Sequence, residues 1–117
     1  MVEMPSTYRV DEESIDQMVQ RIVERFHPLR VILFGSHARG TAHQWSDVDL
    51  LVVLEQTTNS RESAVEIGDT LADLCIAKDI IVSTQEEIAR RGDFPWGVLF
   101  SALREGKVLY ALSLIHI

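Results

Sequence analysis

The chain has 117 residues, 46% hydrophobic and 25% charged, a composition typical of one globular domain with its own core. No apolar run approaches the roughly 20 residues that cross a bilayer, and a single cysteine excludes an internal disulfide, so we expect a cytoplasmic protein without membrane attachment. The net charge of −7 argues against a surface that follows an extended nucleic-acid backbone.

The first expected element is an amphipathic helix. Asp11 is a suitable N-cap, and apolar residues recur at steps of three and four over residues 15–26 before Pro28 ends the pattern. Residues 31–34 are all apolar. We expect them to form a strand in the middle of a sheet, because both of its faces must be covered.

Two further strands and a helix are expected in the middle of the chain. Residues 48–54 predict the second strand, and residues 79–83 predict the third. Between them, Asn59 or Ser60 is expected to cap a helix whose apolar side runs as far as Cys75. The apolar neighbours of Cys75 predict a buried, structural thiol.

The last part of the chain predicts two more helices. Thr84 is a suitable cap for a short charged helix, and Pro95 is suited to open the final one, which Gly106 would stop. Residues 107–112 are expected to form either an edge strand or a tail. The alternation of strands and helices predicts the α/β fold class, with a mixed β-sheet flanked by helices.

One domain is expected, spanning residues 11–111. The apolar residues 112–117 can be encoded by CTGTCTCTTATACACATC, the end sequence of a transposase used to prepare sequencing libraries. We therefore expect residues 112–117 to be a non-native tail, and His116 receives no functional role.

The most informative pattern joins the first two strands. The first apolar run stops at Gly35-Ser36, ten residues follow, and Asp47-Val48-Asp49 opens the second run. Residues two apart on a strand share a face, so Asp47 and Asp49 should project together. Two adjacent carboxylates repel unless a cation lies between them, and Mg²⁺ prefers such oxygen ligands. A tight turn at Gly35, with the Ser36 amide and hydroxyl beyond it, is suited to hold a phosphate.

This pattern resembles the signature of the nucleotidyltransferase superfamily that includes DNA polymerase beta, which reads G-S, about ten residues, then D-x-D. It is more similar still to the minimal nucleotidyltransferases (MNT), whose opening G-S-x-x-R-G is matched by G-S-H-A-R-G at residues 35–40. The resemblance covers most of the chain, roughly residues 19–110. It implies a small nucleotidyltransferase fold.

The resemblance implies transfer of a nucleoside monophosphate from a triphosphate to an acceptor hydroxyl. Two Mg²⁺ ions, about 3.5–4 Å apart, would assist the displacement, held by Asp47 and Asp49. A third catalytic and metal-binding carboxylate is usual in the superfamily. Asp79 is our candidate, because it opens the third strand as Asp47 opens the second; the alternative is a solvated acid. Gly35 and Ser36 would bind the nucleotide.

Three other side chains of the motif region are open to more than one interpretation. Arg39 is a candidate nucleotide-binding residue that pairs with phosphate or with the Asp49 side of the site, and a structural ion pair is the alternative. His37 and His43 are expected to be solvated loop histidines, and contact with the nucleotide or the acceptor is the alternative.

The likeness to MNT proteins also implies a partner, because these proteins are commonly encoded beside HEPN-domain proteins. It implies an antitoxin that transfers AMP from ATP to a tyrosine hydroxyl of a HEPN-type ribonuclease toxin. An acidic chain would suit a basic protein partner. Two alternatives stay open: an adenylyltransferase acting on a small molecule such as an aminoglycoside, and an antitoxin that acts by binding alone. The intact G-S and D-x-D favour catalysis.

Overall fold

Four strands form one sheet, in the spatial order β3-β2-β1-β4. In the computed structural model, which describes residues 11–43, 46–91 and 97–112, their bounds are Arg30–Phe34 (β1), Val48–Leu54 (β2), Lys78–Thr84 (β3) and Lys107–Ala111 (β4). β1 pairs antiparallel with β2 and β4, whereas β2 and β3 are parallel. The mixed sheet is confirmed, β1 is a central strand as predicted, and residues 107–111 form an edge strand rather than a tail.

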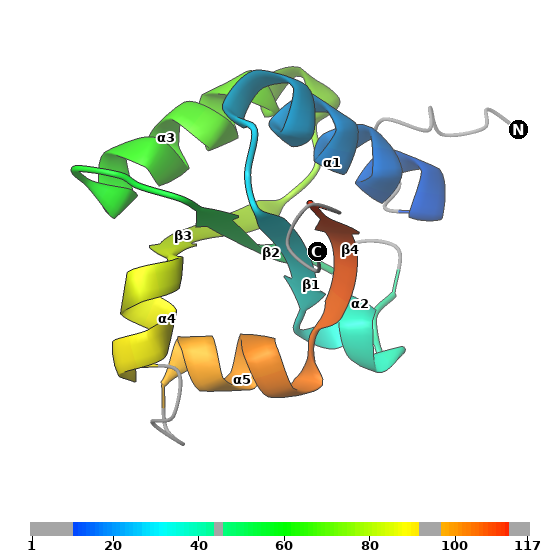
Figure 1. The fold of residues 1–117 in the computed structure, drawn as a ribbon. Coiled ribbons are helices and arrows are strands. Elements are labelled where there is room, and N and C mark those ends of the chain that lie inside the picture. The colour runs from blue at the N-terminus through cyan, green and yellow to red at the C-terminus, as the bar shows by residue number, and fades with distance from the viewer. Residues whose placement is uncertain (1–10, 44–45, 92–96, 113–117) are drawn as a thin grey trace, which may run out of the picture.

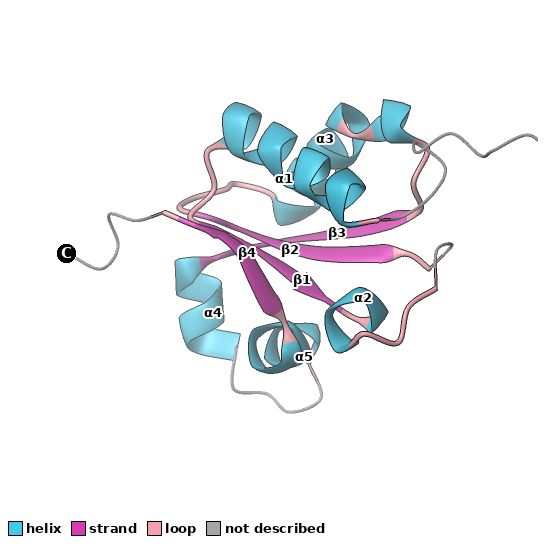
Figure 2. Ribbon diagram, turned by 90° about the vertical axis from the view of Figure 1, so that its right-hand side faces the viewer, coloured by secondary structure: helices cyan, strands magenta, loops and turns pink. Residues whose placement is uncertain are grey.

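Helices cover both faces of this sheet (Figures 1 and 2). Figure 2 shows α1 and α3 on one side and α2, α4 and α5 on the other. Their bounds are Glu12–Phe26 (α1), Ser36–Arg39 (α2), Ser60–Thr70 (α3), Gln85–Arg91 (α4) and Val98–Glu105 (α5). In the described ranges no helix combines the length and apolar character needed to traverse a bilayer.

The predicted helix caps are present. The Ser14 amide donates to Asp11 Oδ1 at 2.8 Å at the start of α1, and the Glu62 amide donates to Asn59 Oδ1 at 3.1 Å at the start of α3. The Glu87 amide similarly donates to Thr84 Oγ1 at 3.2 Å. Each cap satisfies an amide that has no acceptor within its own helix. Local sequence therefore determines where these three helices begin.

The prediction that the third helix runs to Cys75 is wrong. The Leu71 amide bonds to the carbonyl of Gly68 rather than to that of residue 67, so the helix tightens there and gives way to the short 3-10 turn η2 (Ala72–Leu74). Cys75 then adopts φ 54° and is exposed, so the buried thiol is also wrong. This turn directs Leu74 into the core and leaves Cys75 in solvent.

Alternation along β2 divides the core in two. Fifteen buried residues pack between the sheet and the α1 and α3 helices, including Met18, Leu50 and Ile67. Toward α4 and α5, four buried residues of the described ranges make the smaller cluster, among them Leu51. Pro95 lies outside the described residues, but α5 begins at Val98 after Gly97, whose backbone is extended, so the prediction that the last helix opens at Pro95 is wrong. All of the expected tail except Leu112 also lies outside the described residues, and the Leu112 amide donates to the carbonyl of Leu29 at 2.9 Å.

Candidate active site

The turn from β1 into α2 depends on two glycines. Gly35 has φ 74° and ψ −156°, a backbone conformation accessible essentially only to glycine. Gly40 closes the single turn of α2 with φ 76°, and its amide donates to the carbonyl of Ser36. Ser36 is therefore held at the first position of this turn, directly beyond the end of β1.

Gly35 also makes room for a carboxylate. Phe34 at the end of β1 pairs with Asp49 on β2, which brings the Asp49 side chain over the turn. A Cβ atom on residue 35 would overlap Asp49 Oδ2 and lie 3.1 Å from Asp49 Cγ. Glycine is therefore needed at this position for two reasons: it can adopt the backbone conformation, and it leaves space for the Asp49 carboxylate.

Asp49 and Asp79 lie side by side on neighbouring strands. They are partners in the parallel register of β2 and β3, and partners across a sheet share a face. That face is the one covered by α4 and α5, because Leu51 and Ile81 continue it into the smaller core cluster. Asp47 is exposed just before β2, close enough to Asp49 for its charge to raise the pKa of that carboxyl group.

The electrostatics of Asp49 reflect this crowding of carboxylates. Burial raises the pKa of Asp49 above its ordinary value, and the negative charges of Asp79 and Asp47 raise it further. His37 and Arg39 act in the opposite direction with smaller effects. The ionised carboxylate is therefore under-compensated by the side chains around it.

Asp49 and Asp79 are neighbours, but the protein side chains alone do not complete a metal-binding site in the described residues. Within the described part of the chain, no three Asp, Glu, His or Cys side chains are gathered closely enough to hold an ion by themselves. Mg²⁺ commonly binds to one or two carboxylates together with water and substrate phosphates. The pair of Asp49 and Asp79, with Asp47 at the strand start, matches that donor set.

His37 has a contact that its expected role as a solvated loop residue does not include. It is half-buried, and its Nε2 lies 2.9 Å from the carbonyl oxygen of Ser46, to which it donates in the Nε2–H tautomer. The Ser46 amide donates in turn to the carbonyl of His43 at 3.0 Å. His37 thus ties α2 to the residue immediately before Asp47. The sequence carries no signal for this contact, because it depends on how the loop returns.

Arg39 is close to the carboxylates but is shared with another helix. Its Nη1 lies 4.0 Å from Glu105 Oε2 on α5, and about half of each side chain is exposed. An exposed ion pair at this distance contributes little to stability. Arg39 therefore pairs with Glu105 and also lies near enough to Asp49 to affect its pKa.

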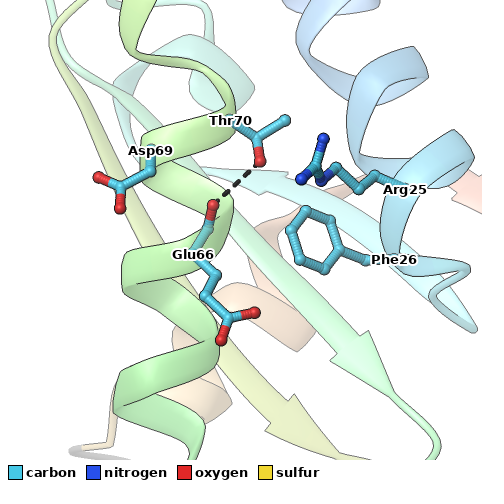
Figure 3. Close-up of a pocket in the computed structure, with 5 residues that line it drawn as sticks. All are labelled: Arg25, Phe26, Glu66, Asp69 and Thr70. Carbon is cyan, nitrogen blue, oxygen red and sulfur yellow. Dashed lines mark hydrogen bonds between the residues drawn. The ribbon is translucent and has the colours of Figure 1, made fainter.

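A hollow of about 310 Å³ adjoins the motif on the side of α5. It is lined by residues from β1, α2 and the α5 region, namely Phe34, Gly35, Arg39, Gly97, Val98, Ser101 and Glu105. A larger hollow of about 400 Å³ lies between α1 and α3 (Figure 3), lined by Arg25, Phe26, Glu66, Asp69 and Thr70. The helices α1 and α3 cover the opposite face of the sheet, so of these two hollows the smaller one is at the motif, where Gly35 and Arg39 line it.

The Gly-Ser and Asp-x-Asp motif, the packing of the Asp49 carboxylate against Gly35 and the mixed sheet together define a nucleotidyltransferase. The family model described as "Nucleotidyltransferase domain" matches residues 15–109, and the chain belongs to that family. Members of the family generally use a divalent metal ion.

Two proteins of Methanocaldococcus jannaschii are similar in sequence. The chain is 28% identical over 110 residues to "Putative protein adenylyltransferase MJ0604", with 86% of this chain and 98% of that protein covered. It is 43% identical over 49 residues to "Putative protein adenylyltransferase MJ1305", a match that covers 40% of this chain and a third (33%) of that protein.

Solved structures agree with the fold. A toxin–antitoxin crystal structure with AMP-PNP superimposes with a TM-score of 0.58 at 21% identity, covering 85% of this chain and 75% of that one. The MntA-HepT toxin–antitoxin structure gives 0.57 at 16% identity, covering 89% and 75%. At these identities the likeness establishes the small nucleotidyltransferase fold.

Proposed function

We propose that this chain transfers AMP from ATP to a tyrosine hydroxyl of a HEPN-type ribonuclease toxin and acts as its antitoxin. The main support for the proposal is the position of the Asp49 carboxylate, which packs against Gly35 and lies beside Asp79, its partner in the pairing of β2 with β3. Two relatives bear the name of protein adenylyltransferases, and the similar structures include toxin–antitoxin pairs, one with AMP-PNP. These likenesses favour a protein acceptor and an adenine nucleotide.

The metal would be Mg²⁺, with two ions in the complete site. Asp47 and Asp49 would hold them, with Asp79 as the third carboxylate. The raised pKa of Asp49, caused by burial and by the two neighbouring carboxylates, fits a site that a hard cation completes. When bound, the ions supply positive charge to the α-phosphate and to the leaving pyrophosphate.

The chain's own residues would then bind and orient the reactants. A bond forms between the tyrosine oxygen and the α-phosphorus of ATP, the bond from that phosphorus to pyrophosphate breaks, and Asp79 accepts the phenolic proton. The Ser36 hydroxyl and amide and the Arg39 guanidinium hold the triphosphate tail. His37 keeps Asp47 in position through the carbonyl of Ser46.

The test is to incubate the chain and its HEPN partner with α-labelled ATP and Mg²⁺. Mass spectrometry should find one adenylyl group or more on a tyrosine of the partner, and its ribonuclease activity should fall in parallel. Chelation of the metal should stop the labelling. The matched control carries Asp47→Asn with Asp49→Asn.

Two results would replace the proposal. If the partner stays unlabelled and the double variant still neutralises it, the antitoxin acts by contact alone. If the partner stays unlabelled while an aminoglycoside becomes adenylylated, the acceptor is a small molecule.

A further inference from the structure

The outer side of α3 carries an apolar residue between opposite charges. Val65 is 58% exposed, which is unusual for a large hydrophobic side chain in this structure. Arg61 lies four residues before it and Asp69 four residues after it, so the three share one stripe of the helix. Both charged residues are exposed as well.

A hollow of about 410 Å³ lies beside this stripe, between α3 and the edge strand β3. Its lining consists of Arg61, Ala64, Val65, Gly68, Ile76, Lys78 and Ile80. Gly68 is in the interior of α3, where glycine is less favourable than alanine, and a Cβ atom there would meet nothing within 4 Å. No neighbour in the described part of the chain requires a glycine here, so the space is open to a side chain from outside.

The charges at the two ends of the stripe are complementary to each other but too far apart to pair. Asp69 follows Arg61 by eight positions, which is about 12 Å along the helix axis. Neither has an ion-pair partner among the residues that the structure describes. Figure 3 shows Asp69 pointing away from Arg25 and Phe26 of α1, and its side chain is exposed.

A second copy of the chain satisfies all of these features at once. When two α3 helices pack antiparallel about a twofold axis at Val65, Arg61 of each copy faces Asp69 of the other. The two valines meet at the axis, where the small residues Ala64 and Gly68 leave room for the opposing helix. Such an interface is self-complementary, as a twofold dimer requires.

We propose that the chain self-associates through this stripe of α3 as a reversible twofold dimer. The stripe lies on the sheet face opposite to Asp49 and Asp79, so dimerisation leaves the candidate active site open to substrate. The inference does not depend on the acceptor or on catalysis.

Sedimentation of the full chain over a range of concentrations tests the proposal. Wild type should show a monomer–dimer equilibrium that weakens at high salt, because exposed ion pairs are screened. Val65→Glu should abolish the dimer by placing two like charges at the axis. Arg61→Asp and Asp69→Lys should each weaken association about tenfold or more. All three positions are exposed, so circular dichroism should show an unchanged fold.

Mixing the two charge variants provides the sharpest result. A heterodimer of Arg61→Asp with Asp69→Lys has opposite charges facing each other at both ends, so mixing should restore association that neither variant has alone. Val108→Glu is the matched control, since Val108 is 54% exposed on β4 and should not affect the dimer. A chain that stays monomeric up to about 1 mM, or a dimer that the charge variants do not weaken and mixing does not restore, would overturn the proposal.

Discussion

The two faces of the sheet differ in their packing and in the side chains that they present: one holds most of the buried core, and the other holds the candidate active site. Among the described residues, fifteen buried ones close the face under α1 and α3, whereas the face toward α4 and α5 has four and ends in Asp49 and Asp79. Burial, and then the negative charges of Asp79 and Asp47, raise the pKa of Asp49, so its ionised form is unfavourable in a fold without a cation. A well-packed opposite face allows the strands to tolerate that cost.

The largest expected effect is on nucleotidyl transfer, when carboxylates of the candidate active site are removed. Asp47→Asn with Asp49→Asn should reduce nucleotidyl transfer by at least about 10³-fold, because the positive charge that stabilises the transferring phosphate is no longer held. Without metal, the variant should unfold at the same temperature as wild type or higher, since repulsion is relieved. Stabilisation by Mg²⁺ with nucleotide should vanish. Asp16→Asn, an exposed acid on α1, is the control, and transfer by the double variant at the wild-type rate would refute this site.

A second prediction compares the two faces directly. Leu50 and Leu51 are both fully buried neighbours on β2, but they belong to different clusters. Replacing a buried leucine by alanine costs about 2–5 kcal/mol, and the cost is larger where the surroundings cannot relax. Leu50→Ala should therefore lose more unfolding free energy in urea than Leu51→Ala. Equal losses would contradict the division between the faces.

A third prediction concerns the contact that holds Asp47 in place. His37→Ala should reduce transfer about 10–100-fold, because the loop before Asp47 loses its contact with α2 and the proposed metal ligand Asp47 shifts. His37→Gln should restore part of the rate, since its amide N–H reaches toward the same carbonyl. His43→Ala is the matched control, because His43 is exposed and donates to Ser46 through its backbone amide. An equal loss in His43→Ala would show that His37 has no special positioning role.

The smallest expected effect is the pH dependence that Asp49 imposes. Its pKa is raised in the folded state, so the folded chain binds a proton more readily than the unfolded chain does. The contribution of Asp49 to stability is therefore present at low pH and is lost as pH rises through the raised value. Asp49→Asn should gain stability over wild type as pH rises from about 4, by under about 1 kcal/mol because the group is partly exposed. Metal-free thermal unfolding at several pH values measures this difference, and a constant difference would contradict it.

The helix starts, the strands and the nucleotide motif could be predicted because each depends on near neighbours. Asp11, Asn59 and Thr84 cap helices through amides only three residues away. Gly35, with Asp49 fourteen positions later, follows a spacing that is visible in the chain itself. The end of α3 was predicted wrongly because the apolar period continued past Leu71, whereas the backbone had already tightened.

The rest was decided by contacts between segments far apart in the chain. Whether residues 107–111 formed a strand depended on β1 having an open edge, and the pairing of Asp49 with Asp79 depended on a parallel register across an intervening helix. The bond from His37 to Ser46 and the pair of Arg39 with Glu105 likewise join different elements. Sequence by itself determined which side chains are available for the chemistry. Only the tertiary structure placed these side chains together, because burial of the sheet faces, and not local sequence, sets the strand register and the path of the loops.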